Sequence, residues 1–538
     1  MNDERLSAAR RALGDNFVEY VLNAEPSTLD HLEVSDARSE CLNLLNEFAS
    51  VLLMARDNTE RITIQTQLVA PSAFLSKSPH AGAASAMRLK CGGDLPSTDS
   101  GDETERLLLE FVRDAYPLLL MPIPEIAFAL PVIYSSGLAK IPAAQRLESA
   151  IMADEHLRKL FPDVSLEEAK RIGSYPVWRS GIGNHNRPKS VIISIIEHVL
   201  ILAALERDPS QETCARIARK TLSLSREIAR RETVSLPVVI GISGIEIAAD
   251  VHRIDLTFGE IRASTPLTRA AFSQGDRGSP IGAIMVIPVS EQLVDVRSWE
   301  PGHGPTEDDL NELWKKRISD ADSRSRLVEK LTTAGRYALL LASEGRDFIA
   351  ARVEVTKQLN PLDTAHQVHQ ATTPFQPFPI ARIERADALR IAEWAQRVDR
   401  DHPEFLDVGV RRILSAASLR LDPLDGFIDA VMCWENLFGD KAETALKVCG
   451  SLAILLEPSD AEKRRTLFRE LKKLYNTRSE LVHGKREPNY QIAHEHRDRA
   501  LQISLQAMRT AFDTPGLLKT PSSLDRFEQV LLGFPPPD

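Results

Sequence analysis

The stretch "AEKRRTLFRELKKLYNTRSELVHG", residues 461–484, decides how the C-terminal part of the chain folds. Its apolar residues recur at spacings of three, four and seven, which is the pattern of a helix with one buried face. They are Leu467, Leu471, Leu474 and Leu481, with Phe468, Tyr475 and Val482 beside them. The pattern predicts a helix over residues 461–483, and its apolar face, when continued, passes through Arg478.

An arginine on a buried face needs a partner, because burying an unpaired charge is costly. A carboxylate, a second subunit or a phosphate could serve. In the preceding segment "DGFIDAVMCWENLFG", residues 425–439, Glu435 lies on the apolar stripe of another expected helix. We therefore expect Glu435 to face Arg478 or His483, either as a buried salt bridge or as a residue that orients a site.

His483 and Gly484 follow at the end of the same helix. Gly484 can form a left-handed C-terminal cap, and the helix dipole then favours a protonated imidazole at His483. His483 lies about 140° around the axis from Arg478 and roughly 7.5 Å along it, so both side chains could reach one phosphodiester. Proton transfer by histidine and charge stabilisation by arginine suit metal-independent RNA cleavage, in which a 2'-hydroxyl attacks the adjacent phosphorus. One histidine cannot easily act as both base and acid, so a catalytic site predicts a dimer.

The charge near this helix is positive although the chain is acidic. Residues 461–487 hold nine Lys or Arg against four Asp or Glu, whereas the whole chain has a net charge of -10. The candidate RNA-binding residues are Lys472, Lys473, Lys485 and Arg486, but a solvated helix face explains the same charge equally well. The R-x4-H spacing is weak by itself, since Arg397 and His402 repeat it.

Proline and glycine divide the C-terminal part into six expected helices with short connections, which favours an antiparallel bundle. Their expected ranges are 386–398, 405–419, 424–438, 442–456, 461–483 and 491–512. Ser459 and Glu462 have the spacing of a capping box at the start of the fifth helix.

The whole chain is predicted to be mainly α, with a small mixed α+β unit in the middle. Expected divisions are a helical segment over 1–91, a flexible Gly- and Ser-rich linker, a helix-rich domain over 105–232, the α+β unit over 235–359, the bundle over 384–515 and a tail over 516–538. In the middle unit, period-two alternation predicts short antiparallel strands, and "LVEKLTTAGRYALLLASE", residues 327–344, predicts a helix. The stretch "WRSGIGNHNRPKS", residues 178–190, is interpreted as a loop, and residues 360–379 as a linker.

Composition excludes several classes of protein. A chain of 538 residues and 59.8 kDa implies about three units, and its acidic charge argues against coating nucleic acid along the whole length. The five scattered cysteines suggest neither disulfides nor zinc, which fits a cytoplasmic protein. The apolar run over residues 116–134 contains four prolines and Glu125, so no membrane span is expected. No cofactor is expected.

A different enzyme in the N-terminal region would need other residues. The candidates His185, His198, His366 and His369 have no partners at diagnostic spacing. We interpret His198 as a core histidine on an apolar helix, and His366 and His369 as loop residues, although this last pair could bind a metal from one helical turn.

The segment "WENLFGDKAETALKV", followed by an apolar helix and "LFRELKKLYNTRSELVHG", resembles the HEPN domain in its Apea-like branch, over residues 386–512. That branch shows an ALExLFG-like stretch and then RxxxxHG at a helix end. "GIEIAADVHRIDLTFGEIRAST", residues 244–265, is similar more loosely to the region that precedes the domain in such proteins.

The resemblance implies an all-α bundle that dimerises and, in many members, cleaves RNA without a metal, often as a bacterial toxin or antiphage effector. Arg478 and His483 match the motif, and Glu435 matches the glutamate of the upstream helix. Ser479 stands where many active members have Asn, Asp or His. Other members are non-catalytic dimerisation or nucleotide-binding modules. The RNA target (tRNA, rRNA or mRNA) stays open, as does the trigger, phage-derived or other, that the N-terminal region would sense.

Overall fold

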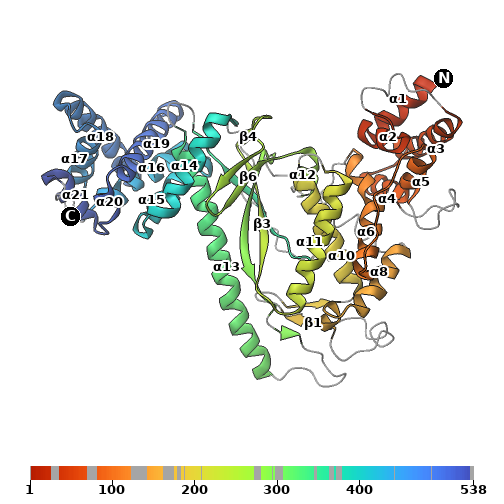
Figure 1. The fold of residues 1–538 in the computed structure, drawn as a ribbon. Coiled ribbons are helices and arrows are strands. Elements are labelled where there is room, and N and C mark those ends of the chain that lie inside the picture. Colours follow the sequence, from red (N-terminus) through yellow and green to blue (C-terminus); the bar gives the residue numbers. More distant parts are fainter. Residues whose placement is uncertain are drawn as a thin grey trace.

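A computed structural model gives the fold. It describes residues 2–25, 35–69, 82–122, 142–161, 175–178, 183–186, 188–206, 209–271, 280–293, 295–296, 307–343, 348–362, 369–370, 379–440, 443–485 and 487–533. The chain is mainly helical, and a small antiparallel sheet at its centre separates the N-terminal helices from the C-terminal helices (Figure 1). None of the described helices combines the length and the apolar character that crossing a bilayer requires.

The N-terminal helices share one hydrophobic core, which includes residues from Ala9 to Leu236. The sequence predicts a division of this region at a flexible linker over residues 91–104, and that division stays a prediction. Cys91 is buried in the core, and Asp102 accepts a hydrogen bond from the backbone N–H of Glu105, which caps α6. The helices are α1 (Asn2–Leu13), α2 (Asp15–Leu22), α3 (Asp36–Leu53), α4 (Asn58–Val69), α5 (Ala83–Lys90), α6 (Glu103–Ala115), η3 (Tyr116–Leu120), α8 (Pro142–Ala153), η4 (Leu157–Leu160), α10 (Pro188–Leu205) and α11 (Gln211–Ala229).

A short three-stranded sheet lies in this region, where a loop was expected. Strand β1 (Tyr175–Trp178) pairs antiparallel with β2 (Gly183–Asn186) and with β8 (Asp295–Val296). The interpretation of residues 178–190 as a plain loop is therefore wrong at β2. Most of the apolar run over residues 116–134 lies outside the described residues, and its first part forms η3.

The central sheet has six strands in the order β10-β9-β3-β7-β6-β5, and each neighbouring pair is antiparallel. The strands are β3 (Val234–Ser243), β5 (Arg253–Leu256), β6 (Gly259–Ala263), β7 (Ala283–Glu291), β9 (Arg352–Gln358) and β10 (His369–Gln370). The antiparallel strands predicted from period-two alternation are confirmed. Apart from this sheet, β4 (Ile245–Ile247) pairs in parallel with β11 (Ala381–Ile383), and the short helix α12 (Pro266–Ala271) follows β6.

The two faces of the sheet belong to different cores, because successive side chains of a strand point to opposite faces. Val238 and Ile240 of β3 join the core shared with the C-terminal helices, whereas Val239 packs with Ile201 and Ala204 of α10. One strand therefore contacts both halves of the molecule.

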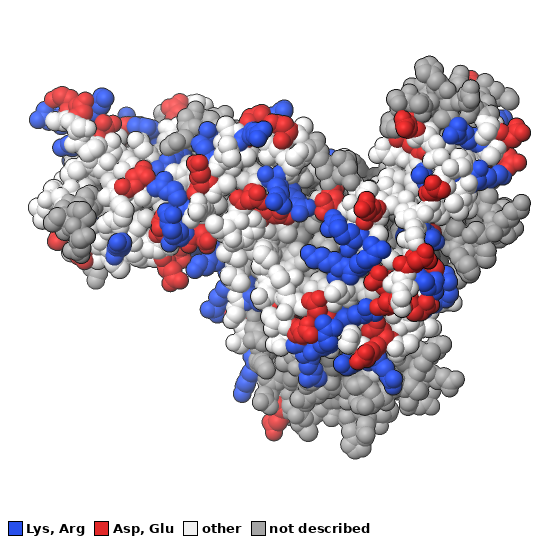
Figure 2. All heavy atoms as spheres, viewed as in Figure 1, with Lys and Arg blue, Asp and Glu red and all other residues white. Residues whose placement is uncertain are grey.

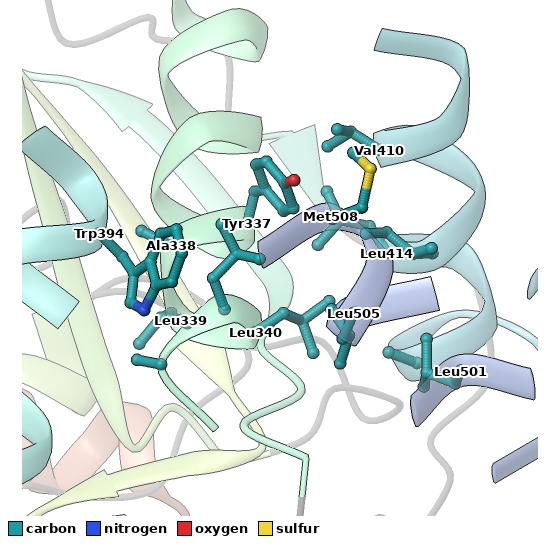
Figure 3. Close-up of a cluster of buried hydrophobic side chains, with 14 of the residues drawn as sticks. Tyr337, Ala338, Leu339, Leu340, Trp394, Val410, Leu414, Leu501, Leu505 and Met508 are labelled. Carbon is teal, nitrogen blue, oxygen red and sulfur yellow. The ribbon is translucent and has the colours of Figure 1, made fainter. Parts of the chain in front are cut away.

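Helix α13 (Glu307–Leu341) joins the sheet to the C-terminal helices, and it begins about 20 residues before the expected helix. Its last residues, Tyr337 to Leu341, are all fully buried. Figure 3 shows Tyr337, Leu339 and Leu340 between Trp394 on one side and Val410, Leu414, Leu505 and Met508 on the other. The sheet and the C-terminal helices thus form one continuous core, although the sequence suggested separate units on either side of residues 360–379.

The six helices expected in the C-terminal part are confirmed as helices, with ends that differ by at most a few residues. They are α14 (Arg385–Asp401), α15 (Asp407–Ser418) preceded by η5 (Glu404–Leu406), α16 (Pro423–Phe438), α17 (Thr444–Leu456), α18 (Ala461–Val482) and α19 (Tyr490–Phe512). Two details were wrong. Asp460, not Ser459, caps α18, because its carboxylate accepts hydrogen bonds from the N–H groups of Glu462 and Lys463. The predicted tail contains α20 (Pro515–Leu518) and α21 (Ser523–Leu532), where the Arg526 side chain donates to backbone oxygens of Asn436 and Leu437 at the end of α16.

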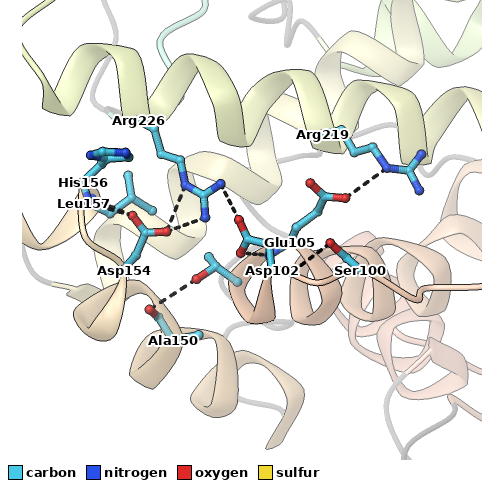
Figure 4. A network of polar contacts seen from close by, with 10 residues as sticks. Ser100, Asp102, Glu105, Ala150, Asp154, His156, Leu157, Arg219 and Arg226 are labelled. Atoms are coloured by element: carbon cyan, nitrogen blue, oxygen red, sulfur yellow. Dashed lines mark hydrogen bonds and ion pairs between the residues drawn. The ribbon is translucent and has the colours of Figure 1, made fainter.

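A partly buried ion-pair network holds three of the N-terminal helices together (Figure 4). Arg226 of α11 pairs with Asp102 at 2.6 Å and with Asp154 at 2.5 Å. Asp154 also accepts hydrogen bonds from the backbone N–H groups of His156 and Leu157, at 3.0 and 2.9 Å. Burial alone would raise the pKa of Asp154, but these hydrogen bonds outweigh burial and hold it below its ordinary value. The hydrogen bond from Arg226 likewise lowers the pKa of Asp102.

We expect Arg226→Ala to lower the free energy of unfolding by about 3 kcal/mol, because it leaves the buried carboxylate of Asp154 without its cation. Urea denaturation followed by circular dichroism measures the change. The matched control is Arg219→Ala on the same helix, whose exposed pair with Glu105 at 3.3 Å should contribute at most about 1 kcal/mol. Because the pKa of both aspartates is lowered, this stabilisation is complete above about pH 4 and disappears as the pH falls through their folded-state pKa values. Equal losses in the two variants at neutral pH would contradict the prediction.

Candidate functional site

The candidate site lies where α16 and α18 meet. Glu435, in the last turn of α16, accepts a hydrogen bond from the Tyr475 hydroxyl at 2.7 Å and pairs with the Arg478 guanidinium at 3.0 Å. The side chains of Arg478 and Glu435 are 19% and 24% exposed, so the pair is largely shielded from solvent. Of the two expected partners of Glu435, Arg478 and His483, the structure shows the contact with Arg478. Arg478 is therefore fixed from within its own chain.

The arginine keeps unused hydrogen-bonding capacity. Its Nε is buried and has no hydrogen-bond partner among the described residues, while one of its terminal nitrogens is bound to Glu435. A guanidinium offers five N–H donors, so a ligand that reaches this end of α18 could bind Arg478 without breaking the pair with Glu435.

Tyr475 is the residue at this site that the sequence did not single out. Burial, with a further contribution from the hydrogen bond to Glu435, raises its pKa well above the ordinary value for tyrosine. The sequence contained a signal, because Tyr475 lies three residues before Arg478 on the same helix face. Tyr475 and Arg478 together hold both oxygens of the Glu435 carboxylate.

His483 stands directly after the last residue of α18 and is exposed. The expected glycine cap is present: Gly484 has φ of 64°, and its N–H donates to the carbonyl of Leu481 at 2.9 Å. The Lys485 N–H donates to the Glu480 carbonyl at 2.9 Å, which completes a Schellman-type end. In the part of the chain that the structure describes, the imidazole has no hydrogen bond or ion pair. His483 is thus presented to solvent, whereas Arg478 points to α16.

The other predicted residues are distributed around α18. Ser479 is half-buried next to Arg478, and its backbone carbonyl accepts from the His483 N–H at 3.1 Å. Lys472 and Lys473 are exposed and, at about 100° per residue, lie roughly 120° and 140° around the helix from Arg478. Lys485 is exposed beside His483, and Arg486 lies outside the described residues. The structure therefore does not bring Lys472 and Lys473 onto the Arg478 side of the helix.

The second R-x4-H match has a different environment. Arg397 pairs with Asp513 at 2.6 Å and lies over the Trp394 ring at 4.4 Å. His402 is within 2.9 Å of Asp407, its ring lies 5.7 Å from that of Tyr337, and burial lowers its pKa. These contacts stabilise the junction of α14 with its neighbours. The imidazole of His402 is engaged with Asp407 and is not presented to solvent as that of His483 is.

The remaining histidine candidates do not form a site among the described residues. His198 is buried and its Nδ1 lies 3.0 Å from the Thr221 hydroxyl, which confirms the interpretation as a core histidine. His185 is in strand β2 and His369 is in the two-residue strand β10. His366 lies outside the described residues.

Comparison of the chain with models of protein families, with curated proteins and with solved structures gives no match. The resemblance to the HEPN domain therefore rests on the residues quoted from the sequence and stays a prediction.

We expect Tyr475→Phe to lower the free energy of unfolding by about 1 kcal/mol, because it removes a hydrogen bond to a half-buried carboxylate. The matched control is Tyr490→Phe, at a tyrosine that is 71% exposed, where we expect a change within about 0.5 kcal/mol. Urea denaturation of the full chain measures both. If the two variants unfold at the same midpoint, the bond to Glu435 contributes nothing.

Proposed function

We propose that this protein is a metal-independent endoribonuclease of HEPN type. The observation that carries the proposal is the pair Glu435–Arg478, which fixes an arginine five residues before an exposed histidine at a glycine-capped helix end. The same residues carry the sequence resemblance. We further propose that it acts in the cytoplasm as a toxin or antiphage effector, and that the N-terminal helices respond to a trigger.

In the proposed reaction, the ribose 2'-hydroxyl attacks the adjacent phosphorus and the bond to the 5'-oxygen breaks, which leaves a cyclic phosphate and a free 5'-hydroxyl. His483 of one chain accepts the 2'-hydroxyl proton, and His483 of a second chain donates a proton to the leaving oxygen. Arg478 stabilises the negative charge that develops on the phosphorane oxygens. Glu435 and Tyr475 position Arg478 and do not contact the RNA.

We expect His483→Ala and Arg478→Ala each to slow RNA cleavage by about 100-fold or more. Purified chain is incubated with tRNA, rRNA and mRNA in EDTA, and products are resolved on denaturing gels. The matched controls are His494→Ala, a nearby histidine of α19, and Arg499→Ala, which removes an α18–α19 ion pair to Glu470 away from the site. Both controls should cleave like the wild type. Full cleavage by His483→Ala would disprove the proposal.

The proposed mechanism requires two chains. Three apolar side chains are exposed near the α18–α19 connection and could form the contact: Val482 at 52%, Tyr490 at 71% and Ile492 at 39%. A homodimer through this end of the C-terminal helices would bring two copies of His483 together.

We expect an excess of His483→Ala chains to suppress the wild-type activity, because a mixed dimer has one histidine where two are needed. Cleavage per wild-type chain should fall in proportion to the wild-type fraction after subunit exchange. The control is the same mixture made with His483→Ala that also carries Val482→Asp and Ile492→Asp, which should not pair and should leave the activity unchanged. Sedimentation velocity checks the oligomeric state. Activity that is independent of the added variant would show that each chain acts alone.

A non-catalytic HEPN module is the second candidate. Ser479, where many active members have Asn, Asp or His, favours it. A module of this kind would bind RNA or a nucleotide, or only dimerise, and His483→Ala would retain its function. If the wild-type chain binds RNA in a gel-shift assay but does not cleave it, this second candidate is favoured.

A further inference from the structure

A groove of about 520 Å³ lies between the N-terminal helices and the central sheet, far along the chain from α18. We call it the α11 groove. Its helical wall includes Arg216, Lys220 and Leu224 of α11, and its sheet wall includes Pro237, Pro288 and Arg262. The volume is within the range of small-molecule sites, which is roughly 300–1,000 Å³.

The groove exists because α10 covers only part of the sheet face. Ile201, Ala204 and Leu205 of α10 bury Val239 and Ile284. Two residues before Val239 on the same face of the sheet, Pro237 of β3 lies opposite Pro288 of β7. Both prolines line the groove. The open part of the sheet thus offers a flat apolar surface of two proline rings and Val286.

Two cations on the helical wall are unpaired. Arg216 and Lys220 are one turn apart on α11 and exposed, and within the described ranges neither makes a hydrogen bond or an ion pair. Other basic residues of the helix differ: Arg219 pairs with Glu105 at 3.3 Å, and Arg226 pairs with two aspartates. Figure 2 shows Lys and Arg side chains gathered over α10 and α11, beside the sheet.

The sheet wall carries both signs of charge. Arg262 of β6 pairs with Glu260 at 2.6 Å and lies 3.7 Å from Glu206, and all three residues line the groove. A second hollow of about 560 Å³ adjoins the groove at Arg262 and Glu206. The site therefore combines free cations, an apolar surface and carboxylates that can accept hydrogen bonds.

We propose that the α11 groove binds a phosphorylated small molecule with a flat ring, of which a mononucleotide is the simplest example. Arg216 and Lys220 bind the phosphate, since charge-assisted hydrogen bonds to phosphate are strong and Arg can bind it through two N–H groups. The ring lies on Pro237 and Pro288, and Glu206 or Glu260 accepts a hydrogen bond from a hydroxyl or amino group of the ligand. The inference is independent of the proposed nuclease activity, because none of its residues belongs to the C-terminal helices.

The experiment titrates the full chain with an N-methylanthraniloyl derivative of ATP and follows its fluorescence. We expect saturable binding that is weakened at least tenfold in Arg216→Ala/Lys220→Ala, because two ionic hydrogen bonds are lost. The matched control is Arg219→Ala. Arg219 lies on the same helix, three residues after Arg216 and directly before Lys220, but it is already paired with Glu105, so its loss should change the affinity less than about twofold. Unlabelled AMP should compete, whereas adenosine or inorganic phosphate alone should compete at least tenfold less well.

Three results would overturn the proposal. The first is no saturable binding up to about 1 mM probe, a typical upper limit for weak ligand sites. The second is unchanged affinity in the double variant, and the third is competition by adenosine as strong as that by AMP. His483→Ala should keep the wild-type affinity. A loss of affinity there would place the probe at α18 and refute the groove as its site. Thermal unfolding of the double variant, which alters two exposed residues, checks that the fold is intact.

Discussion

The structure depends on the burial of one segment, Tyr337 to Leu341 at the end of α13. A helix that is apolar on all sides must be surrounded by protein, and here every side chain of the segment is fully buried. The sheet covers one side, and α14, α15 and α19 cover the rest. Burial of each leucine side chain stabilises the fold by roughly 1.5–3 kcal/mol relative to exposure to water. Separating the sheet from the C-terminal helices would expose these side chains and lose that free energy.

This constraint relates the two sites. The candidate nuclease residues sit on α16 and α18, whose core continues through α13 to one face of the sheet. The α11 groove lies on the other face, and neighbouring residues of β3, Pro237 and Val238, point to the groove and to that core. The sheet is thus the layer that a ligand in the groove and the C-terminal helices both contact. It is a single packed layer, not a hinge between independent domains.

The C-terminal helices are predictable from the sequence because Pro423, Pro458 and Gly484 mark their ends and apolar periodicity marks their buried faces. The sequence also predicts that Glu435 faces Arg478 or His483, since Glu435 and Arg478 both lie on apolar stripes. Ser459 is the predicted cap of α18 because Ser459 and Glu462 have the spacing of a capping box, but in the structure the carboxylate of Asp460 reaches the free N–H groups.

The sequence does not predict contacts between residues that lie far apart in the chain. Two examples are the ion pair between Arg226 and Asp154 and the hydrogen bonds from Arg526 to the end of α16. Each joins segments whose contact cannot be inferred from a local sequence pattern. The α11 groove arises where helices and strands from distant parts of the chain meet, so in the sequence Arg216 and Lys220 are indistinguishable from the basic residues of an ordinary solvated helix face.

The left-handed backbone at Gly484 has a further consequence. No atom of the described residues lies within 4 Å of the position that a Cβ would occupy there, so a larger side chain has room among them. The obstacle is chirality: an L-residue in this conformation costs roughly 1–2 kcal/mol, least for asparagine. The volume of the side chain at this position is therefore less restricted than its backbone angle, and the direction in which the chain leaves α18 after His483 depends on the torsional preference of one residue.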